Sequence, residues 1–233
     1  MKKKLDGKWA LVTGSSRGIG QQIAKGLARR RCNVVVHARH KGDLEKTINM
    51  LHTYDVEAYS LEGDLSTFGG VEKVILGVKS GPGNIDILYN NAAITNKSKS
   101  IWEVSIPEWL ETFQVNLFAV VALCNAFAPG MKLRGYGRII NITSRIQDQP
   151  NLAAYSVSKA AVDKYTRELA VELEGSNVLV NYLDPGWIKT DLGGPYAWYD
   201  IDTVLPGALV PALLEDNGPT GRFFYAQDFK YLE

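Results

Sequence analysis

The sequence is poor in the residues that build disulfide frameworks and metal sites. Among its 233 residues are two cysteines, Cys32 and Cys124, and three histidines, of which His37 and His40 lie close together. Two distant cysteines do not make the disulfide framework of a small secreted domain, and the histidines show no spacing typical of metal ligands. We therefore expect buried free thiols, no metal, and a cytoplasmic protein in a reducing compartment.

An excess of charge and a long apolar segment are also missing. The 26 Lys and Arg residues nearly balance the 25 Asp and Glu residues, which leaves a net charge of +1. No overall field would attract nucleic acid or a membrane, so we expect neither as a partner. The basic start Lys2–Lys4 is not followed by an apolar run long enough for a signal peptide or a membrane span. We expect this start to be a solvated tail.

Linkers, repeats and low-complexity tracts are absent as well, which predicts one domain over residues 1–233. Short apolar runs alternate with longer amphipathic stretches, as in a parallel sheet covered by helices on both faces. We expect strands at 9–13, 33–38, 58–61, 85–89, 138–142, 178–183 and 222–225, and helices at 18–31, 44–54, 70–79, 105–134, 152–174 and 204–214. The irregular segment between them, rich in Gly, Pro, Trp and Tyr, predicts a short substrate loop at about 187–206.

Glycines cluster directly after the first expected strand, in Thr13-Gly14-Ser15-Ser16-Arg17-Gly18-Ile19-Gly20. Glycine permits a tight turn and a close approach of the backbone to a pyrophosphate. The helix that follows offers free N–H groups and a positive dipole end to an anion. The spacing G-x-x-x-G-x-G differs from the G-x-G-x-x-G of many dinucleotide folds, and any tight strand–helix turn can use such a cluster. Its place at the first strand–helix turn favours a dinucleotide site.

The end of the second expected strand indicates which dinucleotide binds. An acid about 20 residues beyond the glycine turn would bind the ribose 2′-hydroxyl of NAD. Here Ala38 is followed by Arg39 and Lys41, with no acid before Asp43. Arg39, joined by Arg17 from the turn, suits a 2′-phosphate because guanidinium groups make bidentate contacts to phosphate oxygens. We expect NADPH to be preferred over NADH; the alternative is that Arg39 and Lys41 are a solvated helix entrance.

A tyrosine and a lysine lie four residues apart in the fifth expected helix. This spacing places Tyr155 and Lys159 on one helix face. A free phenol, with a pKa of about 10, is a poor acid–base catalyst at neutral pH. A nearby ammonium favours the phenolate and lowers that pKa. The pair alone is a weak signal, because many helices carry it as a surface pair.

These motifs, taken in order with several others, make the chain similar to the short-chain dehydrogenase/reductase family over nearly its whole length. The other matching segments are Asp64-Leu65, Asn90-Asn91-Ala92-Ala93, Asn116, Ile140-Asn141-Ile142-Thr143-Ser144 and Asp184-Pro185-Gly186-Trp187-Ile188-Lys189-Thr190. The resemblance implies a doubly wound, Rossmann-type α/β fold with the cofactor at the carboxyl ends of the strands. It also implies hydride transfer between a nicotinamide cofactor and a carbonyl or alcohol carbon.

The resemblance gives each matching residue a role. Tyr155 would exchange the substrate proton, and Ser144 would hydrogen-bond to the carbonyl oxygen. Lys159 would hold the nicotinamide ribose and lower the pKa of Tyr155, and Asn116 would position Lys159 through a water. Asp64 and Leu65 would flank the adenine, Asn91 and Ala92 would border the adenine-side ribose, and Ile188 and Thr190 would hold the carboxamide. The implied cofactor-binding residues are Gly14, Ser16, Arg17, Gly18, Ile19, Gly20, Arg39, Asp64, Leu65, Asn91, Ala92, Tyr155, Lys159, Pro185, Gly186, Ile188 and Thr190. Singly, Ser144 or Asn116 could equally be structural, and Asp64 could begin a turn.

The chain departs from the family pattern at three places. Ala93 stands where the family's Asn-Asn-Ala-Gly motif has glycine. The gap of eleven residues from Ser144 to Tyr155 is short for the family, which leaves open whether Arg145 belongs to a substrate wall. The tail after Thr190 lacks room for a two-helix lid. The loop that remains contains four aromatic residues, which could form a wall for an apolar substrate or could simply pack the loop against the protein: Trp187, Tyr196, Trp198 and Tyr199.

Three functions compete. The first is an NADPH-dependent carbonyl reductase or alcohol dehydrogenase acting on a small molecule. The second is a 3-oxoacyl-(acyl-carrier-protein) reductase, whose acidic partner needs a basic rim to which Lys132, Arg134 and Arg138 could contribute, although Ser176 stands where carrier-binding relatives tend to have a basic residue. The third is a non-catalytic nucleotide sensor on the same fold, a class that usually loses the tyrosine or the lysine.

Assembly is expected from the resemblance alone. The two long helices at 105–134 and 152–174 pair across a two-fold axis in relatives, which implies a homodimer or homotetramer. The last strand often packs at a subunit interface in the family, and the apolar residues Phe223, Phe224 and Tyr225 suit that burial. Both long helices carry apolar stripes that would suit such pairing, but packing in the core of one chain explains the same stripes.

Overall fold

Seven parallel strands form the centre of the computed structural model, which describes residues 5–232; Lys2–Lys4 lie outside the described residues. Along the sheet the order is β3-β2-β1-β4-β5-β6-β7. The strands are β1 (Trp9–Val12), β2 (Asn33–Ala38), β3 (Ala58–Glu62), β4 (Ile87–Asn90), β5 (Gly137–Ile142), β6 (Val178–Asp184) and β7 (Phe223–Tyr225). The all-parallel register confirms the expected α/β class.

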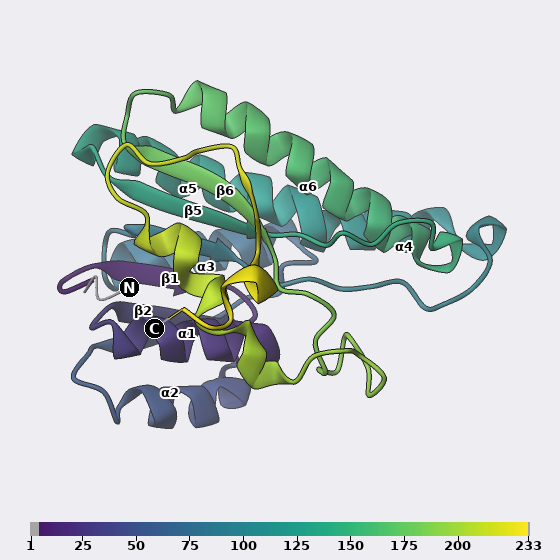
Figure 1. Ribbon diagram of the computed structural model, residues 1–233, viewed down its shortest axis with the longest axis horizontal. Coiled ribbons are helices and arrows are strands. Elements are labelled where there is room, and N and C mark those ends of the chain that lie inside the picture. The colour runs from purple at the N-terminus through teal and green to yellow at the C-terminus, as the bar shows by residue number, and fades with distance from the viewer. Residues whose placement is uncertain (1–4, 233) are drawn as a thin grey trace.

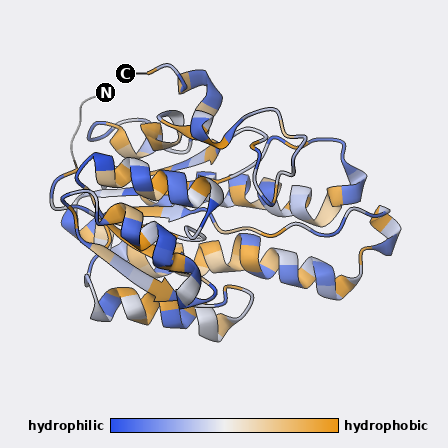
Figure 2. Cartoon of the chain, turned by 90° about the horizontal axis from the view of Figure 1, so that it is seen from below, coloured by the Kyte–Doolittle hydropathy of each residue, from blue (hydrophilic) through white to orange (hydrophobic). Residues whose placement is uncertain are grey.

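Helices cover both faces of the sheet, so the strands are buried on each side and read as continuous apolar runs. The α-helices are α1 (Gly18–Arg29), α2 (Glu45–Leu51), α3 (Phe68–Ser80), α4 (Ile106–Phe113), α5 (Ala119–Arg134) and α6 (Ala153–Glu172). One core lies between the sheet and α1, α2 and the 3₁₀ helix Gly207–Leu213, and the second lies under α3, α5 and α6 (Figure 1). The alternating orange and blue bands of the helices in Figure 2 show the amphipathic pattern that this burial requires.

The direction of winding reverses between two neighbouring strands. From β1 the chain runs outward to β2 and β3, then returns to β4 on the other side of β1 and runs outward to β7. In such a doubly wound sheet, ligands bind in the crevice at the carboxyl ends of the strands where the order reverses. The glycine turn after β1 and the segment after β4 meet at this point.

The expected elements are confirmed with ends that shift by a few residues, apart from the last helix. The helix expected at 204–214 is wrong: the segment forms two 3₁₀ helices, Ile201–Val204 and Gly207–Leu213. Pro206 and Pro211 explain the difference, because proline lacks the N–H that continues an α-helix. The helix expected at 70–79 begins earlier because Thr67 caps it, with its Oγ1 accepting a bond from the Gly70 N–H at 3.0 Å.

The segment 105–134 is one continuous helical rod with a local change of pitch. A π-helical turn, Gln114–Phe118, joins α4 to α5, and such turns often mark functional positions. The rod, Ile106–Arg134, has the length and hydropathy of a membrane-crossing helix, but it packs on the sheet and 44% of its most apolar window is buried. A core helix has the same properties.

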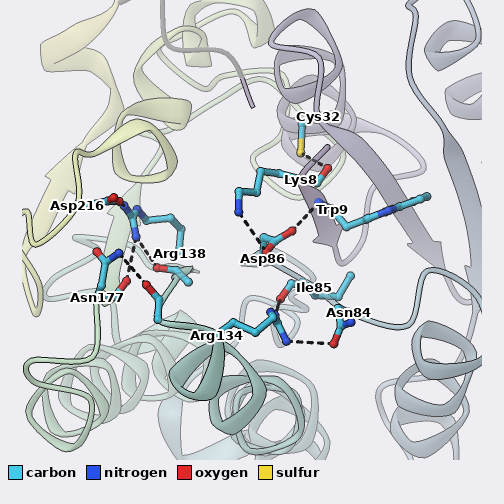
Figure 3. Close-up of polar contacts among 12 residues, drawn as sticks. Lys8, Trp9, Cys32, Asn84, Ile85, Asp86, Arg134, Arg138, Asn177 and Asp216 are labelled. Carbon is cyan, nitrogen blue, oxygen red and sulfur yellow. Dashed lines mark hydrogen bonds and ion pairs between the residues drawn. The ribbon is translucent and has the colours of Figure 1, made fainter. Parts of the chain in front are cut away.

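The amino ends of the strands are closed by a polar cluster (Figure 3). Arg138 at the start of β5 is fully buried and donates to the carbonyl oxygens of Gly137, Asn177 and Leu214 and to Asp216, at 2.9–3.1 Å. Arg134 donates to Asn84 and to the Ile85 carbonyl. Arg134 and Arg138 therefore do not form a basic rim around a substrate pocket, as the second function required; they lie at the edge opposite the glycine turn, and Arg138 is inaccessible.

Replacement of Arg138 by methionine tests this cluster. Arg138→Met removes the guanidinium that donates to the carbonyl oxygens of Gly137, Asn177 and Leu214 and to Asp216, so we expect it to lower the free energy of unfolding by about 3 kcal/mol. Denaturant unfolding measures this change. The control Lys164→Met removes an exposed pair with Glu168 and should change stability by less than about 0.5 kcal/mol; equal effects of the two changes would contradict the structural role of Arg138.

Candidate active site

The glycine turn is shaped for close approach of a ligand. Gly14 and Gly18 have φ values of +62° and +59°, in the left-handed region that favours glycine. A Cβ on Gly20 would lie 2.3 Å from the Gly14 carbonyl oxygen, so no other residue fits there. The first turn of α1 has no side-chain cap and no acid, which leaves its N–H groups available to a phosphate. These residues fit a dinucleotide.

Hydrogen bonds from β4 hold this turn in place. The buried Thr13 hydroxyl accepts bonds from the backbone N–H groups of Asn91 and Ala92, at 2.9 and 3.0 Å. The Asn91 side-chain amide donates to the carbonyl oxygens of Thr13 and Gly14. The side chain of Asn91 therefore fastens the phosphate turn to the next strand, a structural task beside the ribose contact expected for it.

A buried histidine supports the turn from the other side. His37 on β2 is 2% exposed; its Nδ1 accepts the Gly14 N–H at 3.2 Å and its Nε2 lies 2.9 Å from the Gly63 carbonyl oxygen. This pattern needs the neutral ring protonated on Nε2. Burial lowers the pKa of His37, with opposing contributions from the Gly63 carbonyl and Asp64. The ring thereby joins the glycine turn to the exit of β3.

The two arginines expected to read the ribose are both exposed, but their surroundings differ. Arg39 follows β2 and interacts electrostatically with Asp64. Arg17 instead pairs with Asp191, its Nε lying 2.7 Å from the carboxylate. The structure therefore joins Arg17 to the segment that follows Thr190. Ser16 is anchored beside it, since its carbonyl oxygen accepts bonds from Gln21 and Thr47.

Asp64 and Leu65, which we expect to flank the adenine, also have structural roles. The Asp64 carboxylate accepts the Ser66 N–H at 2.9 Å, and hydrogen bonds to Ser66 lower the pKa of Asp64. Asp64 thus begins a turn, which was the alternative explanation for it. Leu65 is 5% exposed and packs in the core beneath α3 and α5.

The segment after β6 folds back toward the glycine turn. Gly186 has a φ of +89°, and Gln227 holds the Pro185 carbonyl oxygen at 2.9 Å. Ile188 is buried, and a Cβ on Gly18 would lie 3.5 Å from the Thr190 side chain. The structure thus places the expected carboxamide-binding segment against the start of α1.

The candidate catalytic residues converge at the carboxyl end of β5. Ser144 follows that strand, and its hydroxyl is hydrogen-bonded to the Tyr155 hydroxyl. Lys159 is 3% exposed; its Nζ donates to the Ile142 carbonyl oxygen at 2.7 Å and lies 5.7 Å from the centre of the Tyr155 ring. The short gap between Ser144 and Tyr155 therefore leaves the three side chains together.

The electrostatics of these groups are dominated by desolvation. Burial raises the pKa of Tyr155 to about 12; its hydrogen bond with Ser144 opposes this shift, and the Asp184 carboxylate adds to it. Burial also lowers the pKa of Lys159 to about 8, against the opposing effect of Asp163 and Asp184. The lowering of the Tyr155 pKa expected from Lys159 is therefore not found in the protein alone, because burial raises that pKa instead. The protein alone holds Tyr155 as a phenol, the form that can donate a proton to a carbonyl oxygen.

Asn116 lies in the π-helical turn and is fully buried. Its side-chain amide donates to the Ile94 carbonyl oxygen and to the Ser158 hydroxyl, and its Oδ1 accepts the Ile94 N–H, all at 2.9 Å. The Ser158 hydroxyl in turn donates to the Tyr155 carbonyl oxygen at 2.7 Å. Asn116 therefore ties the segment after β4 to the helix that carries Tyr155 and Lys159.

The short loop after β6 is folded on itself. Ile188 and Tyr199 form an isolated parallel bridge, and the rings of Trp187 and Trp198 meet edge to face at 5.5 Å. Tyr196 and Trp198 remain 87% and 74% exposed. Trp187 thus packs the loop, while Tyr196 and Trp198 keep the exposure that a substrate wall requires.

Sequence reasoning missed several residues that shape the site. His37 was considered only as a metal ligand, and Asp163 and Asp184 were not considered as charges at all. The signal for His37 was that it is a polar residue in an apolar strand, two residues before Arg39. A polar side chain buried in such a strand needs hydrogen-bond partners. Within residues 5–232, no group of three or more His, Cys, Asp or Glu side chains is arranged to hold a metal ion.

A doubly wound sheet with this glycine turn and this Ser, Tyr and Lys cluster defines an NAD(P)-dependent oxidoreductase. Comparison with known proteins agrees: residues 8–197 match the model of the short chain dehydrogenase family. A 3-oxoacyl-(acyl-carrier-protein) reductase of Aquifex aeolicus is 36% identical over 82% of this chain and 78% of its own length. Dehydrogenase/reductase SDR family member 4 of Sus scrofa is 35% identical over 85% and 72%.

A solved structure gives the same result. The 3-oxoacyl (acyl-carrier-protein) reductase of Agrobacterium tumefaciens C58, with NADP bound, superposes with a TM-score of 0.86 at 26% identity, over 95% of this chain and 93% of that one. The chain belongs to the short chain dehydrogenase family.

The buried His37 makes a pH dependence of stability testable. Because the folded chain lowers the pKa of His37, stability is fully present above the ordinary His pKa of about 6.5 and is lost as pH falls below it. We expect the slope from this one group to approach, at most, about 1.4 kcal/mol per pH unit. Denaturant unfolding at several pH values measures it. His37→Gln should remove this slope, whereas His52→Gln, at an exposed position, should not; a slope unchanged by His37→Gln would disprove the assignment.

Proposed function

We propose that this protein is an NADPH-dependent reductase that converts a ketone or aldehyde of a small molecule into an alcohol, or catalyses the reverse reaction. The observation that carries the proposal is the cluster of Ser144, Tyr155 and Lys159 at the carboxyl end of β5. Bound NADPH would supply the hydride. The protein's own groups orient the substrate and move the proton.

Each residue of the cluster has a part in this reaction. Tyr155 donates the proton from its hydroxyl to the carbonyl oxygen as negative charge develops there. The Ser144 hydroxyl stabilises that charge as an oxyanion-type donor. Lys159 holds the ribose of the cofactor, and its ammonium favours the phenolate that Tyr155 becomes. Asn116 holds the helix that carries Tyr155 and Lys159 against the segment after β4.

The preference for NADPH rests on charge. Arg39 at the end of β2 and Arg17 in the glycine turn are exposed cations, and no acid lies between Arg39 and Asp43. A 2′-phosphate would have to share Arg17 with Asp191. The pyrophosphate would lie on the N–H groups at the start of α1, where Gly14, Gly18, Ile19 and Gly20 leave room.

A second candidate function is reduction of 3-oxoacyl thioesters on acyl carrier protein. It is favoured by the names of relatives such as the Aquifex aeolicus and Staphylococcus epidermidis reductases, which are 36% and 35% identical to this chain. A basic docking rim is disfavoured because Arg138 is buried and because Ser176 stands where carrier-binding relatives tend to have a basic residue. A nucleotide-sensing role is disfavoured because both Tyr155 and Lys159 are present.

We also propose that the protein forms a homodimer or homotetramer in the cytoplasm. Apolar side chains on the outer faces of α4, the π-helical turn and α6 are exposed, among them Ile106 at 70%, Leu110 at 60%, Phe118 at 44% and Val157 at 48%. Association through these helices would cover this apolar surface. The two cysteines are buried free thiols, which suits a reducing compartment.

Tyr155→Phe tests the proton transfer. Loss of the hydroxyl should lower kcat by about 100- to 10,000-fold because the only proton donor of the proposed mechanism is removed. NADPH binding, followed by fluorescence titration, should be largely unchanged. Tyr59→Phe, at an exposed position on β3, is the control and should retain full activity. Turnover that survives in Tyr155→Phe would show that the acid–base assignment is wrong.

Arg39→Asp tests the choice of cofactor. The carboxylate would repel the 2′-phosphate and could accept a bond from the 2′-hydroxyl, so we expect NADPH affinity to fall about 10- to 100-fold and the preference to move toward NADH. Fluorescence titration with both nucleotides gives the ratio. Lys132→Asp makes the same change in net charge on α5 and should leave the ratio unchanged; an unchanged ratio in Arg39→Asp would mean that Arg39 does not contact the phosphate.

A further inference from the structure

A buried carboxylate connects the two loops that carry the candidate catalytic and cofactor-binding residues. Asp184, the last residue of β6, is 5% exposed. Its Oδ1 accepts the Gly186 N–H at 2.7 Å, and its Oδ2 accepts the Arg145 N–H at 2.9 Å. Arg145 directly follows Ser144, and Gly186 begins the segment that leads to Ile188 and Thr190. One side chain therefore fixes the distance between these loops.

Arg145 supplies the counter-charge and is itself held on two sides. Its Nε lies 3.4 Å from the Asp184 Oδ2, and its guanidinium lies 3.7 Å from the centre of the Tyr225 ring. Tyr225 on β7 is paired with Asp184 in the sheet register, and its hydroxyl interacts with Tyr199 in the short loop. A stacked arginine with one edge on a carboxylate keeps a defined orientation.

The charges facing the catalytic pair come from three elements. Asp184 reaches Tyr155 and Lys159 from β6, and Arg145 reaches Asp184 from the loop after β5. Asp163 on α6 lies near Lys159 and accepts a hydrogen bond from the Thr143 hydroxyl, with Arg167 close by. The Ser144 hydroxyl completes the surroundings of the phenol. A negative charge here makes proton loss from Tyr155 or Lys159 harder, and a positive charge makes it easier.

We propose that the Asp184–Arg145 pair is a positioning element of the active site, which sets the distance between the Ser144 and Gly186 loops and the pH range in which Tyr155 exchanges its proton. The pair touches neither reacting atom in this proposal; it acts through Ser144, Tyr155 and Lys159. The inference rests on the proposed function, because a proton exchanged at Tyr155 is what it regulates.

Two substitutions with opposite expected signs test the proposal. Asp184→Asn keeps the size of the side chain and removes one negative charge, so the midpoint of the pH profile of kcat/KM should fall by an amount of the order of one pH unit. Arg145→Met keeps an apolar side chain over Tyr225 and removes the compensating charge, so the midpoint should rise. Because the Asp184 carboxylate acts on both Tyr155 and Lys159, these signs hold for whichever of them loses the first proton. Arg145→Lys restores the charge and should return the midpoint toward that of the wild type.

Controls separate a structural effect from an electrostatic one. Asp86→Asn removes a charge at the opposite edge of the sheet, where Asp86 pairs with Lys8 and accepts the Trp9 N–H (Figure 3), and should leave the midpoint in place. If Asp184→Asn and Arg145→Met lower thermal stability but leave the midpoint unchanged, the pair is only structural and the proposal is wrong. Shifts of the same sign in both variants would also overturn it.

A measurement without turnover keeps the two proposals distinguishable. NMR titration of isotopically labelled tyrosine, with the Tyr155 signal identified by its loss in Tyr155→Phe, follows the phenol directly in the unliganded protein. Asp184→Asn should lower and Arg145→Met should raise the pH at which this signal titrates. If these shifts appear but no carbonyl compound is reduced, the proposed function fails while the proposal about the Asp184–Arg145 pair stands. If carbonyl compounds are reduced but neither variant shifts the titration, the proposed function stands and the proposal about the pair fails.

Discussion

The reversal of winding between β1 and β4 is the constraint on which the site depends. The carboxyl ends of parallel strands all lie at one edge of the sheet. The chain leaves β1 and β4 toward opposite faces of the sheet, so a crevice lies between the two connections. The two strands are then joined across this crevice by the Thr13 hydroxyl, which accepts the N–H groups of Asn91 and Ala92. The glycine turn is therefore held by the neighbouring strand as well as by its own backbone.

The two edges of the sheet differ in how far their polar groups are paired within the chain. At the amino edge, Arg138 donates to three carbonyl oxygens and a carboxylate, and Lys8 pairs with Asp86 (Figure 3). Those charges are paired within the chain, although the buried Nε of Arg138 has no hydrogen-bond partner among the described residues. At the carboxyl edge Arg17 pairs with Asp191 and Arg145 with Asp184, but the first turn of α1 has no side-chain cap and the exposed Arg39 interacts electrostatically with Asp64. The carboxyl edge therefore combines paired charges with donors at the start of α1 that are left for a ligand in the proposed function, whereas the amino edge carries paired charges.

Much of this arrangement could be predicted from the sequence because it follows from local patterns. Alternating apolar and amphipathic segments predicted the strands and five of the six expected helices, and the resemblance carried by the short motifs implied which strand ends would meet. The helix expected at 204–214 was wrong, because Pro206 and Pro211 lack the N–H groups that an α-helix needs and the segment forms 3₁₀ helices instead. The partners of His37, Arg138 and Asp184 could not be predicted, since each lies on a strand whose contacts join residues far apart in the chain. A pattern shows that a polar residue is buried there, but it does not show which atom satisfies it.

The charges around Lys159 explain how an amine can be kept inside this core. Moving an ammonium out of water is costly unless opposite charge and hydrogen bonds accompany it. Lys159 has the Ile142 carbonyl oxygen at 2.7 Å and two nearby carboxylates, Asp163 and Asp184. Two carboxylates beside a single cation would leave the site with excess negative charge, which disfavours a phenolate at Tyr155. Arg145 beside Asp184 and Arg167 near Asp163 reduce that excess, and the hydrogen bond from the Thr143 hydroxyl stabilises the Asp163 carboxylate. In the proposed reaction Lys159 acts beside Tyr155, so the charges that compensate Asp163 and Asp184 extend the site from α6 to β6 and β7.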